Sequence, residues 1–290
     1  MKKSRKLATL GICSALFLGL AACQQQHVTS EGTNQRQSSS AKVPWKASYT
    51  NLNNQVSTEE VKSLLSAHLD PNSVDAFFNL VNDYNTIVGS TGLSGDFTSF
   101  THTEYDVEKI SHLWNQKKGD FVGTNCRINS YCLLKNSVTI PKLEKNDQLL
   151  FLDNDAIDKG KVFDSQDKAE FDILFSRVPT EATTDVKVHA EKMETFFSQF
   201  QFNEKARMLS VVLHDNLDGE YLFVGHVGVL VPADDGFLFV EKLTFEEPYQ
   251  AIKFASKEDC YKYLGTKYAD YTGEGLAKPF IMDNDKWVKL

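Results

Sequence analysis

The first residue whose type and position suggest chemistry is Cys126, in the stretch GTNCRINSYCLL (123–134). It follows Asn125, a residue type that commonly caps a helix N-terminus. A thiol in the first helical position lies at the positive end of the helix dipole, and the neighbouring Arg127 adds a positive charge, so the thiolate is favoured. Cys126 is therefore a candidate nucleophile, with Asn125 and Arg127 as candidate binding residues. A small core cysteine at a helix start is the alternative interpretation.

His226 is the candidate general base, because it interrupts the apolar run YLFVGHVGVLV (221–231). An imidazole there is costly to bury without a hydrogen-bond partner, so a core histidine bonded to a backbone carbonyl is the competing interpretation. In a regular strand, the face of His226 also carries Leu222, Val224, Gly228 and Leu230. We expect Gly228 to leave empty space beside the ring.

The turn after this strand decides which side chain of GFLFVEKLTF (236–245) faces His226. A two-residue turn at 234–235 or 235–236, or the four-residue turn ADDG, puts Glu241 on the face of His226. A three- or five-residue loop presents Lys242 instead. Glu241 is the candidate residue that orients the imidazole, and Lys242 with Tyr249 are candidates for lining a ligand cleft.

The other thiols and the acidic segments suggest structural roles. Cys132 and Cys260 fall on apolar helical stripes, where cysteines are usually core residues. Cys126 and Cys132, about 9 Å apart along a helix, are too distant for a disulfide. FLDNDAIDKG (151–160) and HDNLDGE (214–220) lack the calcium-loop spacing and are interpreted as solvated turns. No zinc-binding spacing occurs, so we expect no metal or other cofactor.

The elements that must position these residues change type along the chain. Residues 57–136 have helical periodicity, with a helix over 125–136 that begins at the Asn125 cap. Residues 147–290 mix strands and helices. Strands are predicted at 149–152, 171–178, 207–215, 221–231 and 236–245, and helices at 185–200 and from about 256. This order predicts one α+β domain over 45–290, in which the helical cluster packs on an antiparallel sheet.

The N-terminus indicates export. Residues 1–22 have the basic start and short apolar core of a signal peptide, and 23–44 are a polar tract that is typical of a flexible tether. The end of the signal, LAAC (20–23), resembles the lipobox of bacterial lipoproteins, which implies a lipid on Cys23 and an anchored protein on the outer face of the cell membrane. Cleavage leaves 27 basic against 39 acidic residues, a net charge near −12, which argues against nucleic-acid binding.

A cysteine at a helix start, a histidine on a strand about 100 residues later and an acid on the next strand resemble a papain-like arrangement. The resemblance is to the NlpC-type cysteine peptidases and amidases of bacterial cell walls. It implies Cys126 as nucleophile, His226 as base and Glu241 as orienting residue, with the Cys126 N–H and the Asn125 side chain stabilising the oxyanion. It also implies amide or ester hydrolysis, with peptidoglycan peptides as the substrate class.

The strings GTNCRI, VGHVGVLV and FVEKLTFEEPYQAIKF are similar to those of an uncharacterised family of Gram-positive lipoproteins whose domain has no assigned function. This resemblance implies a domain over most of the mature chain and no particular activity. The alternative function is therefore a non-catalytic lipoprotein that binds a ligand or partner on the same scaffold. We expect a monomer in either case.

Overall fold

The computed structural model describes residues 45–100 and 103–290, and these residues fall within one unit of mutual contacts. The predicted signal peptide (1–22), the tether (23–44) and the lipid site Cys23 lie outside the described residues and stay predictions. Within the described part of the chain, no helix has the length and apolar character needed to cross a membrane.

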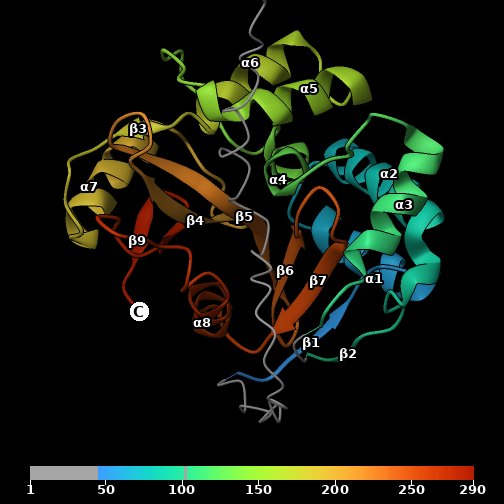
Figure 1. Cartoon of the computed structure of the whole chain (residues 1–290). Helices are drawn as coiled ribbons and strands as arrows, with labels where there is room; N and C mark the ends of the chain where they lie inside the picture. Colours follow the sequence, from blue (N-terminus) through green and yellow to red (C-terminus); the bar gives the residue numbers. More distant parts are fainter. Residues whose placement is uncertain (1–44, 101–102) are drawn as a thin grey trace, which may run out of the picture. The chain divides into compact units, whose positions relative to one another are not determined.

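The described residues build an α+β fold around an antiparallel sheet of nine strands (Figure 1). Its order is β2-β1-β7-β6-β5-β4-β8-β9, and β3 pairs with β5. The strands are β1 (Ala47–Thr50), β2 (Thr98–Ser99), β3 (Val178–Pro179), β4 (Arg207–Asp215), β5 (Tyr221–Ala233), β6 (Gly236–Lys242), β7 (Tyr249–Phe254), β8 (Phe280–Asp283) and β9 (Lys286–Val288).

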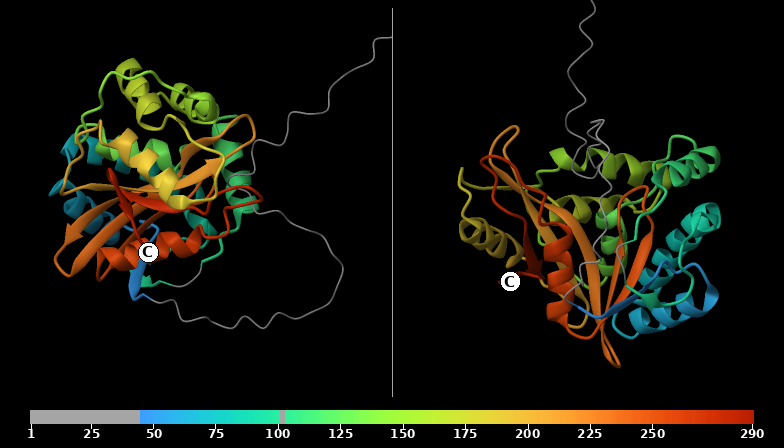
Figure 2. Two further views of the ribbon diagram at one scale, coloured as in Figure 1. Left: turned by 90° about the vertical axis from the view of Figure 1, so that its left-hand side faces the viewer. Right: turned by 60° about the horizontal axis from the view of Figure 1, so that its bottom comes forward.

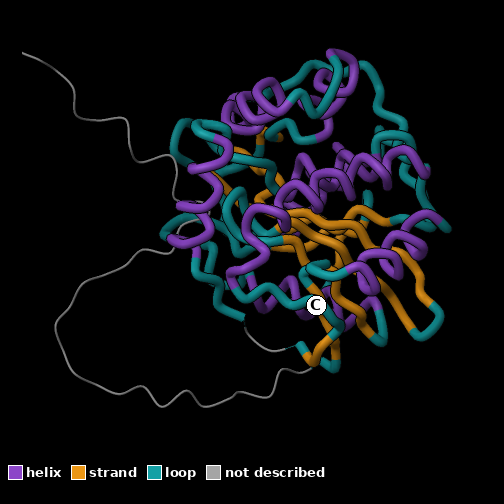
Figure 3. The backbone as a smooth tube through the Cα atoms, turned by 90° about the vertical axis from the view of Figure 1, so that its right-hand side faces the viewer, coloured by secondary structure: helices purple, strands orange, loops and turns teal. Residues whose placement is uncertain are grey.

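Helices lie around the strands (Figure 3). They are α1 (Gln55–Ser66), α2 (Pro71–Val88), α3 (Val107–Lys118), α4 (Cys126–Leu134), α5 (Phe151–Gly160), α6 (Ser165–Leu174), α7 (Val186–Phe197) and α8 (Lys257–Lys267). The sheet separates two hydrophobic clusters. The larger contains apolar side chains of α1 to α7, and the smaller contains those of α8. The predicted helical cluster on an antiparallel sheet is confirmed at this coarse level.

Two predicted strands are wrong. Residues 149–152 and 171–178 contribute mainly to α5 and to the end of α6. The N-cap Asp164 accepts hydrogen bonds from the N–H groups of Gln166 and Asp167, and Phe171 and Leu174 are buried at helical spacing. Four to eight apolar residues have too little periodicity to separate a strand from a buried helix segment.

A bulge in β5 changes the faces expected from simple alternation. Val211 of β4 pairs with His226 and Val212 pairs with Val224, so Gly225 is the extra residue. A Cβ at Gly225 would lie 2.3 Å from Leu213 Cδ1, so any other residue there would displace the Leu213 side chain. The bulge sends Leu222 and Val224 into the larger cluster, whereas the residues after it keep the expected alternation. Placing those two on the face of His226 was therefore wrong.

The β5–β6 hairpin confirms a two-residue turn at 234–235. Ala233 pairs with Gly236, and the pairing of the two strands ends at Val229 with Val240. Continued by one residue, this register puts Glu241 opposite Gly228. The space at Gly228 is not empty as expected, because a Cβ there would lie 2.3 Å from Cζ of Phe239. Because Gly228 has no side chain, the ring of Phe239 can occupy this space.

Beyond the last pair, β5 and β6 separate. Residues 241–242 of β6 pair with β7, while residues 221–228 of β5 pair with β4. The two strands form a V that opens toward α4 (Figures 1 and 2). Because α4 contacts both strands, its first residue can approach side chains on the far face of the sheet.

Candidate functional site

Cys126 is the first residue of α4, as predicted. Asn125 has extended backbone angles, and its Oδ1 accepts a hydrogen bond of 3.1 Å from the Ile128 N–H. The cap satisfies one N–H of the first turn and orients the others outward, so the Cys126 thiol and N–H both lie at the positive helix end.

Two hydrogen bonds attach α4 to β5. Ser130 Oγ donates to the Val227 carbonyl at 3.2 Å, and Arg127 Nη1 donates to the Val224 carbonyl at 3.0 Å. Both carbonyls lie near His226 in sequence. The same helix face that carries Cys126 is thereby held against the strand that carries the imidazole.

Asp153 of α5 is the residue that fixes the α4 N-terminus from outside. Its side chain is fully buried and accepts from Asn125 Nδ2 at 2.7 Å, from Arg127 Nε at 2.9 Å and from Arg127 Nη2 at 2.7 Å. Interpreting FLDNDAIDKG as a solvated turn was wrong. Only the three-dimensional fold reveals this contact, because an acid in a polar-looking segment 26 residues from Arg127 carries no local signal of burial.

His226 and Glu241 form the core of the site. The His226 Nε2 and Glu241 Oε2 atoms lie 2.5 Å apart, and both residues are about 1% exposed. Tyr263 of α8 donates to Glu241 Oε1 at 2.5 Å, and Lys267 Nζ lies 3.7 Å from the same oxygen. Burial opposes ionisation, but the Lys267 charge and the hydrogen bonds from His226 and Tyr263 lower the pKa of Glu241 to about 2.

Tyr268 covers the imidazole from the α8 side. Its ring stacks on that of His226 with centroids 4.8 Å apart and planes inclined by 23°. Tyr263 and Tyr268 belong to the apolar stripe of Cys260, which the sequence indicates as core. The stripe does not reveal that they contact His226 and Glu241, because the packing of α8 on the sheet is a long-range contact.

The thiol of Cys126 lies within hydrogen-bonding range of the His226 ring. Burial raises the pKa of the thiol, but the charge and hydrogen bond of His226, helped by Arg127, outweigh it and lower the pKa. Burial likewise opposes the imidazolium, while Cys126 and Glu241 raise the pKa of His226. Since Nε2 is bound to Glu241, Nδ1 is the ring nitrogen left for the thiol. The lowered pKa of Cys126 and the raised pKa of His226 favour a thiolate–imidazolium pair.

The other two thiols lack these neighbours. Cys132 and Cys260 are buried and free, as is Cys126, so the expected absence of a Cys126–Cys132 disulfide is confirmed. Burial raises the pKa of Cys132 to about 12 and raises that of Cys260. Cys126 is thus the described cysteine whose surroundings favour the thiolate.

Lys242 does not line an open cleft. It is 1% exposed, and its ammonium donates to the carbonyls of Thr244 (2.7 Å), Phe245 (3.2 Å) and Glu247. The ammonium also lies 4.2 Å from the ring centroid of Tyr84 and 5.3 Å from that of Tyr249. Burial lowers its pKa to about 7. Lys242 is the anchor of the loop formed by residues 243–248.

Tyr249 is also a scaffold residue. Its hydroxyl donates to Asn129 Oδ1 at 3.0 Å and lies 3.4 Å from Thr124 Oγ1, and Asn129 Nδ2 donates to Thr124 Oγ1 at 2.9 Å. These contacts connect β7 with α4 and with the turn before it. Of the candidate binding residues, Asn125, Arg127 and Tyr249 therefore hold the helix of Cys126, whereas Lys242 anchors the loop of residues 243–248.

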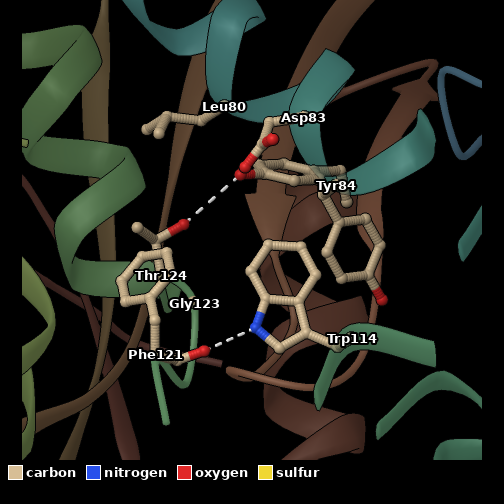
Figure 4. Close-up of a pocket in the computed structure, with 8 residues that line it drawn as sticks. Leu80, Asp83, Tyr84, Trp114, Phe121, Gly123 and Thr124 are labelled. Atoms are coloured by element: carbon tan, nitrogen blue, oxygen red, sulfur yellow. Dashed lines mark hydrogen bonds between the residues drawn. The ribbon is translucent and has the colours of Figure 1, made fainter. Parts of the chain in front are cut away.

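Two pockets adjoin the turn before α4, residues 122–124. A recess of about 20 Å³, the size of one water molecule, is lined by side chains of α2 and α3 and by Gly123, Thr124 and Tyr249 (Figure 4). A second pocket of about 170 Å³ shares Tyr84 and Trp114 with it. Neither lining includes Cys126, which is 5% exposed, or His226. Cys126 and His226 are thus enclosed and open into neither of these two pockets.

Comparison with known proteins gives one match. Residues 48–288 match the model of a domain of unknown function, DUF4300. Neither the curated proteins nor the solved structures give a match to this chain. The matched segment includes Cys126, His226 and Glu241 together with the elements that position them. The chain belongs to the DUF4300 family.

Proposed function

We propose that this protein is a cysteine hydrolase that cleaves an amide or ester through a thioester intermediate. One observation carries the proposal. Cys126 at a helix N-terminus lies within hydrogen-bonding range of His226, whose other nitrogen is bound to the buried Glu241. The three residues have the types and order of contacts that nucleophile, base and orienting acid require.

In the acylation step, the Cys126 thiolate attacks the substrate carbonyl and forms a carbon–sulfur bond. The imidazolium of His226 then gives its proton to the leaving amine or alcohol as the bond to that group breaks. Glu241 holds the ring so that Nδ1 faces the sulfur and stabilises the positive charge before transfer. The products are a thioester on Cys126 and a neutral His226.

In the second step, His226 takes a proton from water as the water oxygen attacks the thioester. Collapse of the tetrahedral intermediate breaks the carbon–sulfur bond and releases the carboxylic acid. The thiolate–imidazolium pair is restored. No redox change or additional reactant is required.

The oxyanion of each tetrahedral intermediate would lie at the N-terminus of α4. The Cys126 N–H is in the first helical position, where helix geometry leaves it without an intrahelical acceptor. The Asn125 side chain is a poor second donor, because Oδ1 caps the helix and Nδ2 donates to Asp153. We therefore assign to Asn125 the positioning of Cys126.

A papain-like assignment and a cell-surface location belong to the same proposal. The order of helix cysteine, strand histidine and next-strand acid supports the first, and the LAAC (20–23) signal end supports the second. A lipid on Cys23 would hold the domain on the outer face of the membrane. The accessible amides there include peptidoglycan peptides, which we propose as substrates.

The test is digestion of purified Gram-positive peptidoglycan by the full chain and by its Cys126→Ser variant. The proposal predicts new amino or carboxyl termini with the first protein and none with the second, together with a thioester on Cys126 that mass spectrometry detects after acid quenching. If the two proteins give equal products, or neither becomes acylated by peptidoglycan or by activated esters, the hydrolase assignment fails.

The enclosure of Cys126 and His226 favours a second function, in which the protein is a non-catalytic lipoprotein that binds a ligand. Cys126 and His226 are 5% and 1% exposed. Under this function Cys126 and His226 form a buried structural ion pair. Active-site probes that carry a small electrophile would then leave Cys126 unmodified in the folded protein, whereas a hydrolase that opens for its substrate becomes labelled.

A further inference from the structure

The pocket of about 170 Å³ has a mainly apolar and aromatic lining. Tyr84, Ile110 and Trp114 are buried and form its floor, and Val122 and Phe245 contribute apolar walls. This volume is below that of pockets for drug-sized ligands and suits a single side chain. The pocket therefore fits an apolar group attached to a larger molecule.

The turn that precedes α4 connects the pocket wall at Val122 with Cys126 along the chain. Gly123 has φ +91°, and a Cβ on it would lie 3.2 Å from Trp114 and 3.5 Å from the Phe245 carbonyl. The turn thus passes between the two pocket walls and continues directly into Asn125 and Cys126. A chain whose side group fills the pocket would run along this turn toward the thiol.

The mouth of the pocket carries an excess of negative charge. Glu246 lines it and is exposed, and Glu247 follows on the same loop. Asp83 is paired with Lys118 at 2.7 Å, and the buried Lys242, which binds the backbone carbonyl of Glu247, carries at most one positive charge against the two glutamates. One uncompensated carboxylate remains among these groups, so a ligand with one positive charge is complementary.

The pocket walls already bind ammonium groups of the protein itself. Lys242 Nζ donates to carbonyls of the 243–248 loop and lies over Tyr84, while Lys118 Nζ lies 5.6 Å from the ring centroid of Trp114. Aromatic faces and carbonyl oxygens both attract cations. The rings of Tyr84 and Trp114, which these ammonium groups contact, also line the pocket.

We propose that this pocket is a binding site for an aliphatic side chain that ends in an ammonium group, as in lysine or another diamino acid. The methylene chain packs on Ile110 and Trp114, and the ammonium faces Glu246 at the mouth. The assignment of this side chain to the substrate rests on the proposed hydrolase function. The binding of this side chain to the pocket does not depend on the hydrolase function.

The test uses the Cys126→Ala full chain, so that binding is measured without turnover. The probes are Nα-acetyl-lysine amide and Nα-acetyl-norleucine amide, which lacks the ammonium. Binding is followed by the NMR signal of the Trp114 indole N–H, which donates to the Phe121 carbonyl at 2.7 Å. Trp45 and Trp287 provide internal reference signals. We expect the lysine probe to bind about fivefold more tightly and to shift the Trp114 signal selectively.

Glu246→Gln should remove most of this preference, while Glu274→Gln, an exposed glutamate outside the pocket lining, should leave it unchanged. Equal or tighter binding of the norleucine probe overturns the proposal, as does the absence of a selective Trp114 shift. The two proposals fail separately. Lysine binding without any acylation of wild-type Cys126 removes only the hydrolase, and hydrolysis with no preference for a cationic side chain removes only this subsite.

Discussion

Glu241 binds His226 through a contact of 2.5 Å between Oε2 and Nε2, and the opposite oxygen of the same carboxylate accepts from Tyr263. The carboxylate is therefore fixed at both ends in a fully buried position. With Nε2 bound to Glu241, Nδ1 is the ring nitrogen left for the hydrogen bond with Cys126. Glu241 acts on the thiol only through that ring.

Glu241→Gln should lower the pKa of His226, because the carboxylate helps to raise it. The thiolate fraction of Cys126 at pH 7 should fall with it, and any hydrolytic rate by roughly 10²–10⁴-fold. NMR titration of the imidazole and thiolate absorbance measure the two effects. Glu258→Gln, an exposed change at the start of α8, is the control. An unchanged His226 pKa would contradict the role of Glu241.

Asp153→Ala should lower the free energy of unfolding by about 2–4 kcal/mol, because it leaves Arg127 and Asn125 without their buried partner. Urea unfolding measures the change. Asp155→Ala removes an exposed acid of the same helix, paired with Lys159, and should cost at most about 1 kcal/mol. Equal effects of the two variants would show that Asp153 does not hold the N-terminus of α4.

Acid should destabilise the fold through His189. Burial lowers the pKa of this histidine, whose Nε2 donates to the Thr183 carbonyl at 2.7 Å and whose ring lies 4.4 Å from that of His214. Since its pKa is lower folded than unfolded, its contribution is complete above pH 6.5 and is lost as pH falls below that value.

The free energy of urea unfolding at pH 7 and pH 5 measures this loss. His189→Gln should make the difference between the two pH values smaller, and His112→Gln, on the exposed side of α3, should not. A pH difference that is the same in all three proteins would contradict the role of His189.

Lys242→Met should release the 243–248 loop, because three carbonyls lose their donor. Hydrogen exchange of the amides of residues 244–247 should accelerate. The exposed change Lys262→Met should leave these amides unaffected. Unaltered exchange in the loop of Lys242→Met would show that the ammonium is not its anchor.

Local patterns predict much of this site. Asn125 before an apolar-periodic segment predicts the cap, and the two-residue turn at 234–235 fixes Glu241 on the face of His226, because a strand has a period of two. These signals need only a few neighbouring residues. They are sufficient for the order of nucleophile, base and acid.

The remaining contacts depend on packing between distant elements. Asp153 is buried only because α5 packs against the start of α4, and Tyr268 meets His226 only because α8 covers that face of the sheet. The bulge at Gly225 lies against the Leu213 side chain of β4. No spacing along the chain encodes these contacts.

The pH dependence of Cys126 alkylation by iodoacetamide measures whether His226 keeps Cys126 as a thiolate. Limited access to the buried thiol changes the rate at every pH, whereas the apparent pKa reports the thiolate. We predict an apparent pKa below the ordinary value of about 8.5 in the wild type and a higher one in His226→Gln. An apparent pKa at or above 8.5 in the wild type, unchanged by His226→Gln, would contradict this role of His226.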